Sequence, residues 1–228
     1  MVISDRDETR TGQLTLLVAA LLLIAGCGGG GGGGQAITPS GSSCSSRAIF
    51  AAPDESDYIL PFPVGESSEV LQAYCTSGSH SNQLAYDFIR PFGSEVSVVR
   101  DGTVRNVTSH HPDFTEDNVH NNVLIVHDDF TTAFYAHLQQ DSILVAVDDV
   151  VFAGQVIGLN GSSGTPTACD SHILNPPRDQ CAILHFGVYA TYPPQEGNDI
   201  AVNFRNAEGI LDANDGLARG ETYTALSY

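Results

Sequence analysis

Short runs rich in apolar, β-branched and aromatic residues, several alternating with polar ones, recur between residues 58 and 206. Alternation of this kind is typical of β-strands, and turn residues separate the runs. Two pairs of runs are spaced as hairpins, around Asp101-Gly102 and around Asp128-Asp129. The pattern predicts an all-β fold with an antiparallel, barrel-like or sandwich core and long surface loops. The runs are 86–89, 94–99, 103–107, 123–127, 131–137, 143–147, 150–155 and 181–189.

Asp87 and His185 stand inside two of these runs, where polar residues are uncommon. An aspartate is unfavourable within a strand unless it is paired or bound to a metal. A lone strand histidine is usually a half-buried polar residue, and His185 shares its face of the strand with Ile183. His80 and His137 also lie at or near strand ends. Two imidazoles and one carboxylate make a ligand set for a catalytic zinc with an open fourth position.

Four motifs follow one another along the chain: His80 with Asp87, then Tyr135-Ala136-His137-Leu138, then glycines from Gly154 to Gly164, then Leu184-His185-Phe186. This order resembles the lysostaphin/LytM family of zinc metallopeptidases, which cut peptide cross-links of bacterial peptidoglycan. The resemblance covers roughly residues 57–206, which we assign to a peptidase-like domain.

The resemblance implies that His80, Asp87 and His185 bind Zn²⁺. It also implies that His137 is catalytic and hydrogen-bonds the metal-bound water or the developing oxyanion. One position departs from the family, whose last motif is His-x-His with a catalytic first histidine, because here that position is Ile183. Isoleucine can neither accept a proton nor donate a hydrogen bond. Loss of such an acid–base group typically costs on the order of 100- to 10,000-fold in rate.

Substitutes for the missing histidine remain open. Segment 169–181 is longer than the usual link in the family, and its His172 could reach the vacant position if a Cys169–Cys181 disulfide folds the segment back. Asp170 and His111 are weaker alternatives. Two functions follow: a metallopeptidase that hydrolyses peptidoglycan peptides, or a catalytically impaired member that binds zinc or peptidoglycan, or regulates a partner cell-wall hydrolase.

The stretch 109–122 is polar and contains His110, His111 and His120. We interpret it as a surface loop whose histidines are structural or solvated, since isolated loop histidines seldom have another role.

The N-terminus carries an apolar run at 14–25, too short for a comfortable transmembrane helix and typical of a signal peptide. The run ends in Leu23-Ile24-Ala25-Gly26-Cys27, which resembles a bacterial lipoprotein signal with cleavage after residue 26 and lipid on Cys27. An uncleaved membrane anchor is the alternative. Gly28, in place of Asp, suggests an outer-membrane lipoprotein that faces the periplasm of the cell envelope.

Residues 27–56 contain an unbroken glycine run at 28–34 and serine- and proline-containing sequence. Such sequence buries little apolar surface, so we predict a flexible tether between a lipid anchor and the domain. Residues 207–228 are predicted to form a C-terminal extension that packs on the domain.

Lipidation of Cys27 leaves four cysteines, an even number that indicates disulfides in an exported protein. We pair Cys169 with Cys181 and Cys44 with Cys75, although three connectivities are open. No close Cys-x-x-Cys occurs, which argues against a cysteine zinc site.

The chain has 9 basic and 27 acidic residues, for a formal charge of −18. This balance argues against nucleic-acid binding and against electrostatic attachment to anionic lipid, both of which need lysine and arginine. The absence of tryptophan argues against a carbohydrate-binding module with aromatic platforms.

Overall fold

The computed structural model describes residues 43–115, 117–164 and 182–228. Strands dominate this part of the chain, and none of its helices is long and apolar enough to cross a membrane. In chain order the elements are α1 (Cys44–Arg47), the 3₁₀ turn η1 (Pro53–Glu55), β1 (Ser67–Gln72), β2 (Ala85–Arg90), β3 (Glu95–Ser97), β4 (Gly102–Thr108), β5 (Asn121–Val126), β6 (Thr132–Leu138), β7 (Val150–Val151), β8 (Val156–Leu159), β9 (Ala182–Tyr189), β10 (Asp199–Ile200), β11 (Ala207–Glu208) and β12 (Thr222–Ala225).

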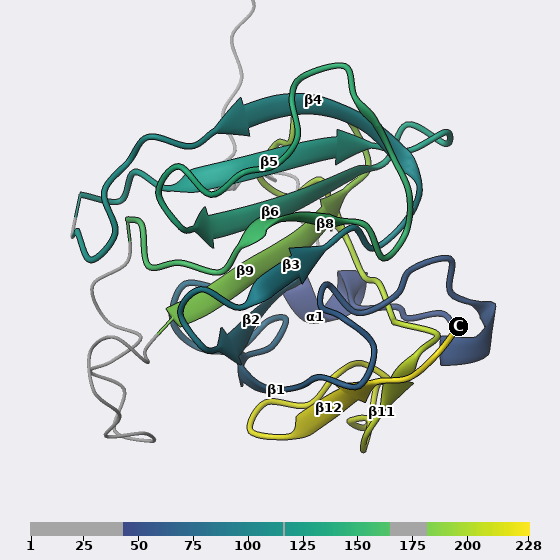
Figure 1. Cartoon of the computed structure of the whole chain (residues 1–228). Helices are drawn as coiled ribbons and strands as arrows, with labels where there is room; N and C mark the ends of the chain where they lie inside the picture. The colour runs from purple at the N-terminus through teal and green to yellow at the C-terminus, as the bar shows by residue number, and fades with distance from the viewer. Residues whose placement is uncertain (1–42, 116, 165–181) are drawn as a thin grey trace, which may run out of the picture. The chain divides into compact units, whose positions relative to one another are not determined.

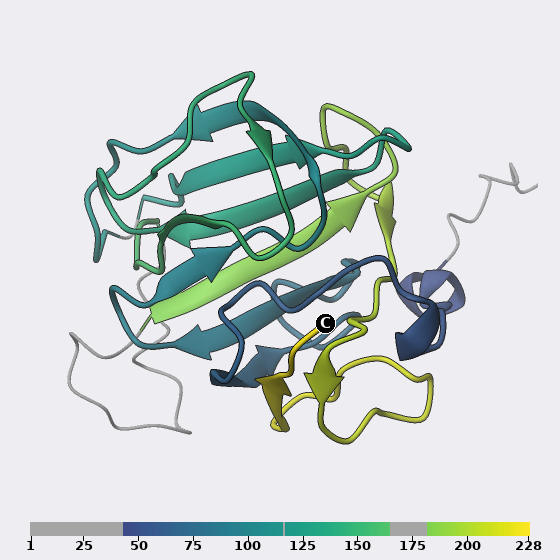
Figure 2. The same cartoon turned by 45° about the vertical axis from the view of Figure 1, so that its right-hand side comes forward.

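One large antiparallel sheet organises the fold (Figure 1), in the order β11-β12-β1-β2-β9-β6-β5-β4-β7, with β10 paired to β9. Strands β3 and β8 form a second, two-stranded sheet, which lies in front of β9 in Figures 1 and 2. The predicted all-β antiparallel class is confirmed. The large sheet is an open path from β11 to β7, so the described strands do not close a barrel.

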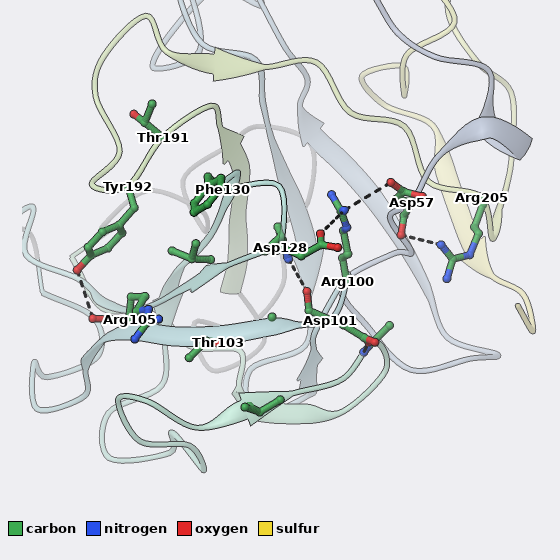
Figure 3. Close-up of a pocket in the computed structure, with 15 residues that line it drawn as sticks. Asp57, Arg100, Asp101, Thr103, Arg105, Asp128, Phe130, Thr191, Tyr192 and Arg205 are labelled. Carbon is green, nitrogen blue, oxygen red and sulfur yellow. Dashed lines mark hydrogen bonds and ion pairs between the residues drawn. The ribbon is translucent and has the colours of Figure 1, made fainter.

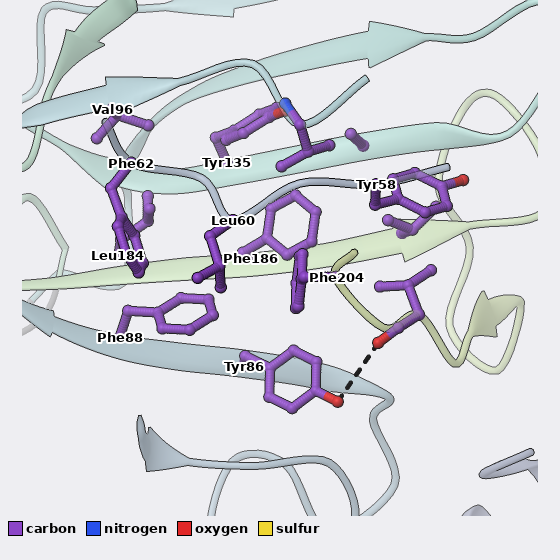
Figure 4. Packing of buried hydrophobic residues seen from close by; sticks show 14 of the residues in the cluster. Tyr58, Leu60, Phe62, Tyr86, Phe88, Val96, Tyr135, Leu184, Phe186 and Phe204 are labelled. Carbon is purple, nitrogen blue, oxygen red and sulfur yellow. Dashed lines mark hydrogen bonds between the residues drawn. The ribbon is translucent and has the colours of Figure 1, made fainter. Parts of the chain in front are cut away.

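The core lies against one face of the large sheet. Leu184 and Phe186 of β9 point to this face and are fully buried. Figure 4 shows them among aromatic rings of neighbouring strands and of the segment that runs from Tyr58 to Phe62 across the sheet. Phe186 lies 5.8 Å from Phe204, measured between ring centroids. Burial of each such side chain is worth about 1.5–3 kcal/mol, so this face supplies much of the stability.

The opposite face of β9 carries different residues, because side chains alternate along a strand. Ile183 and His185 point to this side. The β2–β9 register places Asp87 directly opposite His185, and the β6–β9 register places Ala136 there. The strand pattern thus brings the carboxylate and the imidazole of two separate runs together on the non-core face.

One of the two predicted hairpins is confirmed and the other is wrong. Strands β5 and β6 pair as expected around Asp128-Asp129. Strands β3 and β4 do not pair with each other, because β3 pairs with β8 while β4 pairs with β5 and β7. The reason is burial: Val96, Val98 and Val99 are all fully buried in the layer that covers the core. The chain therefore passes from one sheet to the other near Asp101. The run at 143–147, also predicted to be a strand, is not a strand in the structure.

The predicted tether extends too far toward the domain. Cys44 lies in α1, is buried, and forms a disulfide with Cys75, which confirms that predicted pair. Arg47 binds Asp199 through an ion pair of 2.6 Å. Residues 43–47 are thus fastened to the domain by a covalent bond and a partly buried ion pair, in place of hanging freely. Signal residues 1–26, Cys27 and the glycine run lie outside the described residues.

The segment 207–228 does more than pack on the domain. Its strand β12 pairs with β1 and extends the large sheet, as the yellow strands beside β1 show in Figures 1 and 2. Tyr223 and Ala225 are fully buried in the core. The predicted boundary at residue 206 therefore cuts through one continuous sheet.

Candidate metal centre

Three side chains that could hold a metal ion converge on the non-core face of β2 and β9. Across the strand pair, Nδ1 of His185 lies 2.8 Å from Oδ1 of Asp87. Nε2 of His80 lies 3.2 Å from Nδ1 of His185 and 3.3 Å from Oδ1 of Asp87. His80 and Asp87 are almost completely buried, and His185 is partly exposed.

His80 reaches this place from the loop between β1 and β2. The Cys44–Cys75 disulfide fastens the beginning of the loop. Inside the loop, the Cys75 amide donates to the carbonyl of Gln83, and the Gln83 amide donates to the carbonyl of His80. A crosslink and local backbone bonds thus position a ligand that no strand carries.

The spacing of the three atoms fits one zinc ion. In a tetrahedral site with metal–ligand bonds of about 2.0–2.1 Å, ligand atoms lie about 3.3 Å apart. The separations here are 2.8, 3.2 and 3.3 Å. Three protein ligands would leave a fourth position for water or substrate.

The second oxygen of Asp87 has its own partner. A register shift in the β1–β2 pair places Gln72 opposite Asp87. Nε2 of Gln72 donates to Oδ2 of Asp87 at 3.2 Å, so the carboxylate is oriented with Oδ1 toward the histidines. Such contacts behind a ligand typically fix its orientation and tune metal affinity.

The two histidines stabilise the ionised form of Asp87. Burial alone would raise the pKa of this carboxyl, but hydrogen bonds from His185 and His80 outweigh burial and hold the pKa well below its usual range. Asp87 is therefore ionised at neutral pH, as a metal ligand must be.

His137 lies beside the cluster because of a β-bulge. The β5–β6 register shifts between Asn121 and Asn122, and His137 has a left-handed φ of 64°. In a regular strand, the side chains of His137 and Ala136 would lie on opposite faces of the sheet, so His137 would point away from His185. The bulge turns the His137 side chain toward the cluster instead. Its ring centroid lies 6.2 Å from that of His185.

A backbone carbonyl sets the tautomer of His137. Nδ1 donates to the carbonyl of Ser163 at 2.8 Å, which leaves Nε2 as the acceptor. Burial first, and then the nearby His185, lower the pKa of His137 to about 4. At neutral pH the ring is an uncharged base.

Sequence reasoning missed two aromatic neighbours of the cluster. His120, interpreted as structural or solvated, is half-buried with its ring centroid 5.3 Å from that of His137. Phe134 packs against two of these imidazoles: its ring centroid lies 5.6 Å from that of His120 and 5.8 Å from that of His185. The alternation of β6 could have indicated Phe134, whereas no sequence signal distinguishes His120 from the other histidines of its loop.

Ile183 is buried on the same side of β9 as His185, so an apolar side chain does occupy the vacant position. Of the alternatives to a histidine there, the ring of His111 packs against His110 at 4.3 Å between centroids. His172 and Asp170 lie outside the described residues, as does the predicted Cys169–Cys181 pair.

A separate cavity of about 1130 Å³ lies where β4 begins and β5 ends (Figure 3). None of the candidate metal ligands lines it. Its three arginines are engaged within the protein, so the cavity offers little free positive charge for an anionic ligand. The pairs are Arg100 with Asp128, Arg105 with Asp148, and Arg205 with the carbonyl of Asp57.

The fold and these side chains define a β-protein that can hold one divalent metal ion beside a buried neutral imidazole. The chain belongs to peptidase family M23, whose sequence model matches residues 81–198. The matched span contains Asp87, His137 and His185, and His80 immediately precedes it. Peptidases of this family are generally zinc-dependent.

Several solved structures are similar to this chain. A zinc containing peptidase from Vibrio cholerae is 23% identical, with a TM-score of 0.42; the similarity covers 64% of this chain and 39% of that one. The catalytic domain of lysostaphin from Staphylococcus simulans is 19% identical, with a TM-score of 0.41, covering 59% and 86%. The catalytic domain of a mutant of the prophage-encoded M23 protein EnpA from Enterococcus faecalis is 22% identical, with a TM-score of 0.43, covering 61% and 93%. No curated protein matches the chain.

Proposed function

We propose that this chain is a zinc metallopeptidase that hydrolyses peptide cross-links of peptidoglycan. In this proposal it works in the bacterial cell envelope, anchored by lipid on Cys27 to the outer membrane and facing the periplasm. The observation that carries the proposal is the convergence of His80, Asp87 and His185 within zinc-ligand spacing, in a chain of family M23.

In the proposed site, His80 and His185 supply ring nitrogens and Asp87 supplies the carboxylate. Zinc bound there would lower the pKa of its water to about 7 and polarise a peptide carbonyl.

His137 supplies the base. Its Nε2 accepts a proton from the attacking water while the new C–O bond forms, and returns it to the leaving nitrogen as the C–N bond breaks. The Ser163 carbonyl accepts a hydrogen bond from Nδ1–H of His137 during the reaction. This hydrogen bond keeps the ring in the orientation in which Nε2 can accept the proton.

A second function is favoured by one observation, the buried Ile183 at a position where the family has a catalytic histidine. In this alternative the chain binds zinc or peptidoglycan without turnover, or regulates a partner cell-wall hydrolase. The cluster of ligands would then serve binding alone.

Metal content and peptidoglycan digestion by the purified full-length chain distinguish the two. If the chain is a peptidase, we expect about one zinc per chain and digestion of peptidoglycan. His185→Ala should abolish both zinc binding and digestion. His110→Ala, at an exposed loop position, should change neither. Zinc without digestion, with digestion gained in Ile183→His, would establish the second function. A wild-type chain that binds no zinc would overturn the peptidase and the zinc-binding form of the second function.

A further inference from the structure

The arrangement of imidazoles around the cluster differs from what the sequence motif alone suggests. His137 contributes one imidazole, and position 183 contributes none. The non-core face nevertheless holds a second imidazole that is not part of the metal cluster, that of His120, which enters from the loop before β5.

The ring of His120 lies over the face that carries the cluster. Its centroid is 5.3 Å from that of His137 and 5.6 Å from that of Phe134. Phe134 in turn contacts His185 at 5.8 Å. His120 thus lies beside His137 on the face that carries the metal ligands, and its side chain is partly exposed.

The backbone that carries His120 is held firmly. The next residue, Asn121, is fully buried, and its Nδ2 donates to the carbonyls of His111 and Leu138 at 2.8 and 3.0 Å. The Asn121 amide donates to Oγ of Ser163 at 3.0 Å. These bonds tie the loop both to the strand that carries His137 and to the residue whose carbonyl orients it.

A glycine contact closes the other side of the loop. Gly164 has a φ of 67°, and a Cβ built there would lie 2.5 Å from the carbonyl oxygen of Val119. Only glycine permits this approach of the 160–164 turn to the residue before His120. The position of His120 is therefore built into the packing of two loops.

We propose that His120, beside His137, is the second catalytic imidazole of this site and supplies a polar group that Ile183 cannot. Its ring N–H donates a hydrogen bond to the oxygen of the scissile carbonyl as negative charge develops there. The proton that His137 takes from the water still goes to the leaving nitrogen, so His120 gains and loses no proton. The inference rests on the proposed peptidase function.

The test compares single variants of the full-length chain in peptidoglycan digestion and in zinc content. His120→Ala is expected to lower the rate constant about 100- to 1,000-fold, the usual effect of removing one oxyanion donor, with zinc content unchanged. His120→Gln, which keeps an N–H donor but cannot titrate, is expected to retain at least about tenfold more activity than His120→Ala, because the donor survives. The matched control is His110→Ala, in the same loop, with wild-type activity.

Digestion by His120→Ala within about threefold of the wild type would overturn the inference and leave the peptidase function standing, since a lost oxyanion donor costs far more. Loss of zinc in His120→Ala would also overturn it, because His120 would then serve metal binding. Equal loss in the Ala and Gln variants would contradict the hydrogen-bond role. A wild-type chain that binds zinc but digests nothing would remove both the proposed function and this inference.

Discussion

The two faces of β9 show how one strand supports two different tasks. On one face Leu184 and Phe186 are fully buried among other apolar side chains. On the other face His185 lies against Asp87 and His80, polar groups that compensate one another. Burial of apolar surface is non-directional, whereas the polar cluster depends on distances of about 3 Å. Substitutions on the core face should therefore lower stability, and substitutions on the other face should lower metal binding and turnover.

Among the residues of the cluster face that do not bind the metal, the largest effect is expected at His137. His137→Gln should lower peptidoglycan hydrolysis about 100- to 10,000-fold, because it removes the proton acceptor. Zinc content should stay at the wild-type level, since His137 is not among the ligands. Digestion kinetics and metal analysis of the same preparation measure both, and loss of zinc would show that His137 acts in binding.

The core face is tested with two phenylalanines on opposite sides of the large sheet. Phe186→Ala should lower the free energy of unfolding by about 3–5 kcal/mol, because it leaves a cavity in a packed core. Phe134→Ala, at a half-buried residue on the cluster face, should lower it by about 1 kcal/mol. Urea denaturation of both variants measures the difference, and equal losses would contradict the division between the faces.

The pH dependence of stability reports the burial of His137. The folded chain holds the pKa of this group at about 4, below the ordinary value of 6.5. Between these values the unfolded chain binds a proton that the folded chain does not, so the free energy of unfolding falls as pH falls from 6.5 to 4. The loss from this group is up to about 3 kcal/mol and ends below pH 4.

The measurement is urea denaturation of the metal-free chain across this range, for the wild type and for His137→Gln. The variant should lack this part of the pH dependence, together with the part that arises from the charge interactions of His137 with His185 and His120. Identical curves would show that His137 titrates normally in the folded state.

The smallest effect is expected at Gln72, which contacts a metal ligand but does not itself bind the metal. Gln72→Ala removes the donor to Oδ2 of Asp87 and should weaken zinc affinity about 10- to 100-fold. Gln83→Ala is the control, because the hydrogen bonds of Gln83 within the His80 loop come from its backbone. Competition with a chelator measures both affinities. Unchanged affinity in Gln72→Ala would mean that the strands alone orient the carboxylate.

The sequence was informative where the strand pattern decides the outcome. The alternation of β9 correctly put Ile183 and His185 on one face, and the hairpin of β5 and β6 formed as predicted. The resemblance named the residues that the structure brings together, but only the β2–β9 register explains why Asp87 meets His185. Register depends on the packing of the whole sheet, which a single strand pattern does not contain.

Other features depend on contacts between distant segments. The bulge that re-aims His137 comes from a register shift, and the loop of His120 is ordered by Asn121 and Ser163, which lie 42 residues apart. The failed hairpin has the same origin, because the valines before Asp101 are drawn into the layer over the core. Local patterns show which residues favour strands, but they do not show which partners those strands find.

The Cys44–Cys75 disulfide links the entry of the domain to the loop that delivers His80. Before this bond forms, that loop lacks its covalent fastening, and the residues that close the metal cluster are less preorganised. A crosslink over 31 residues contributes roughly 2–4 kcal/mol to folding. Full affinity for metal would therefore require the oxidised chain, and reduction of this bond is expected to weaken the cluster that His80 completes.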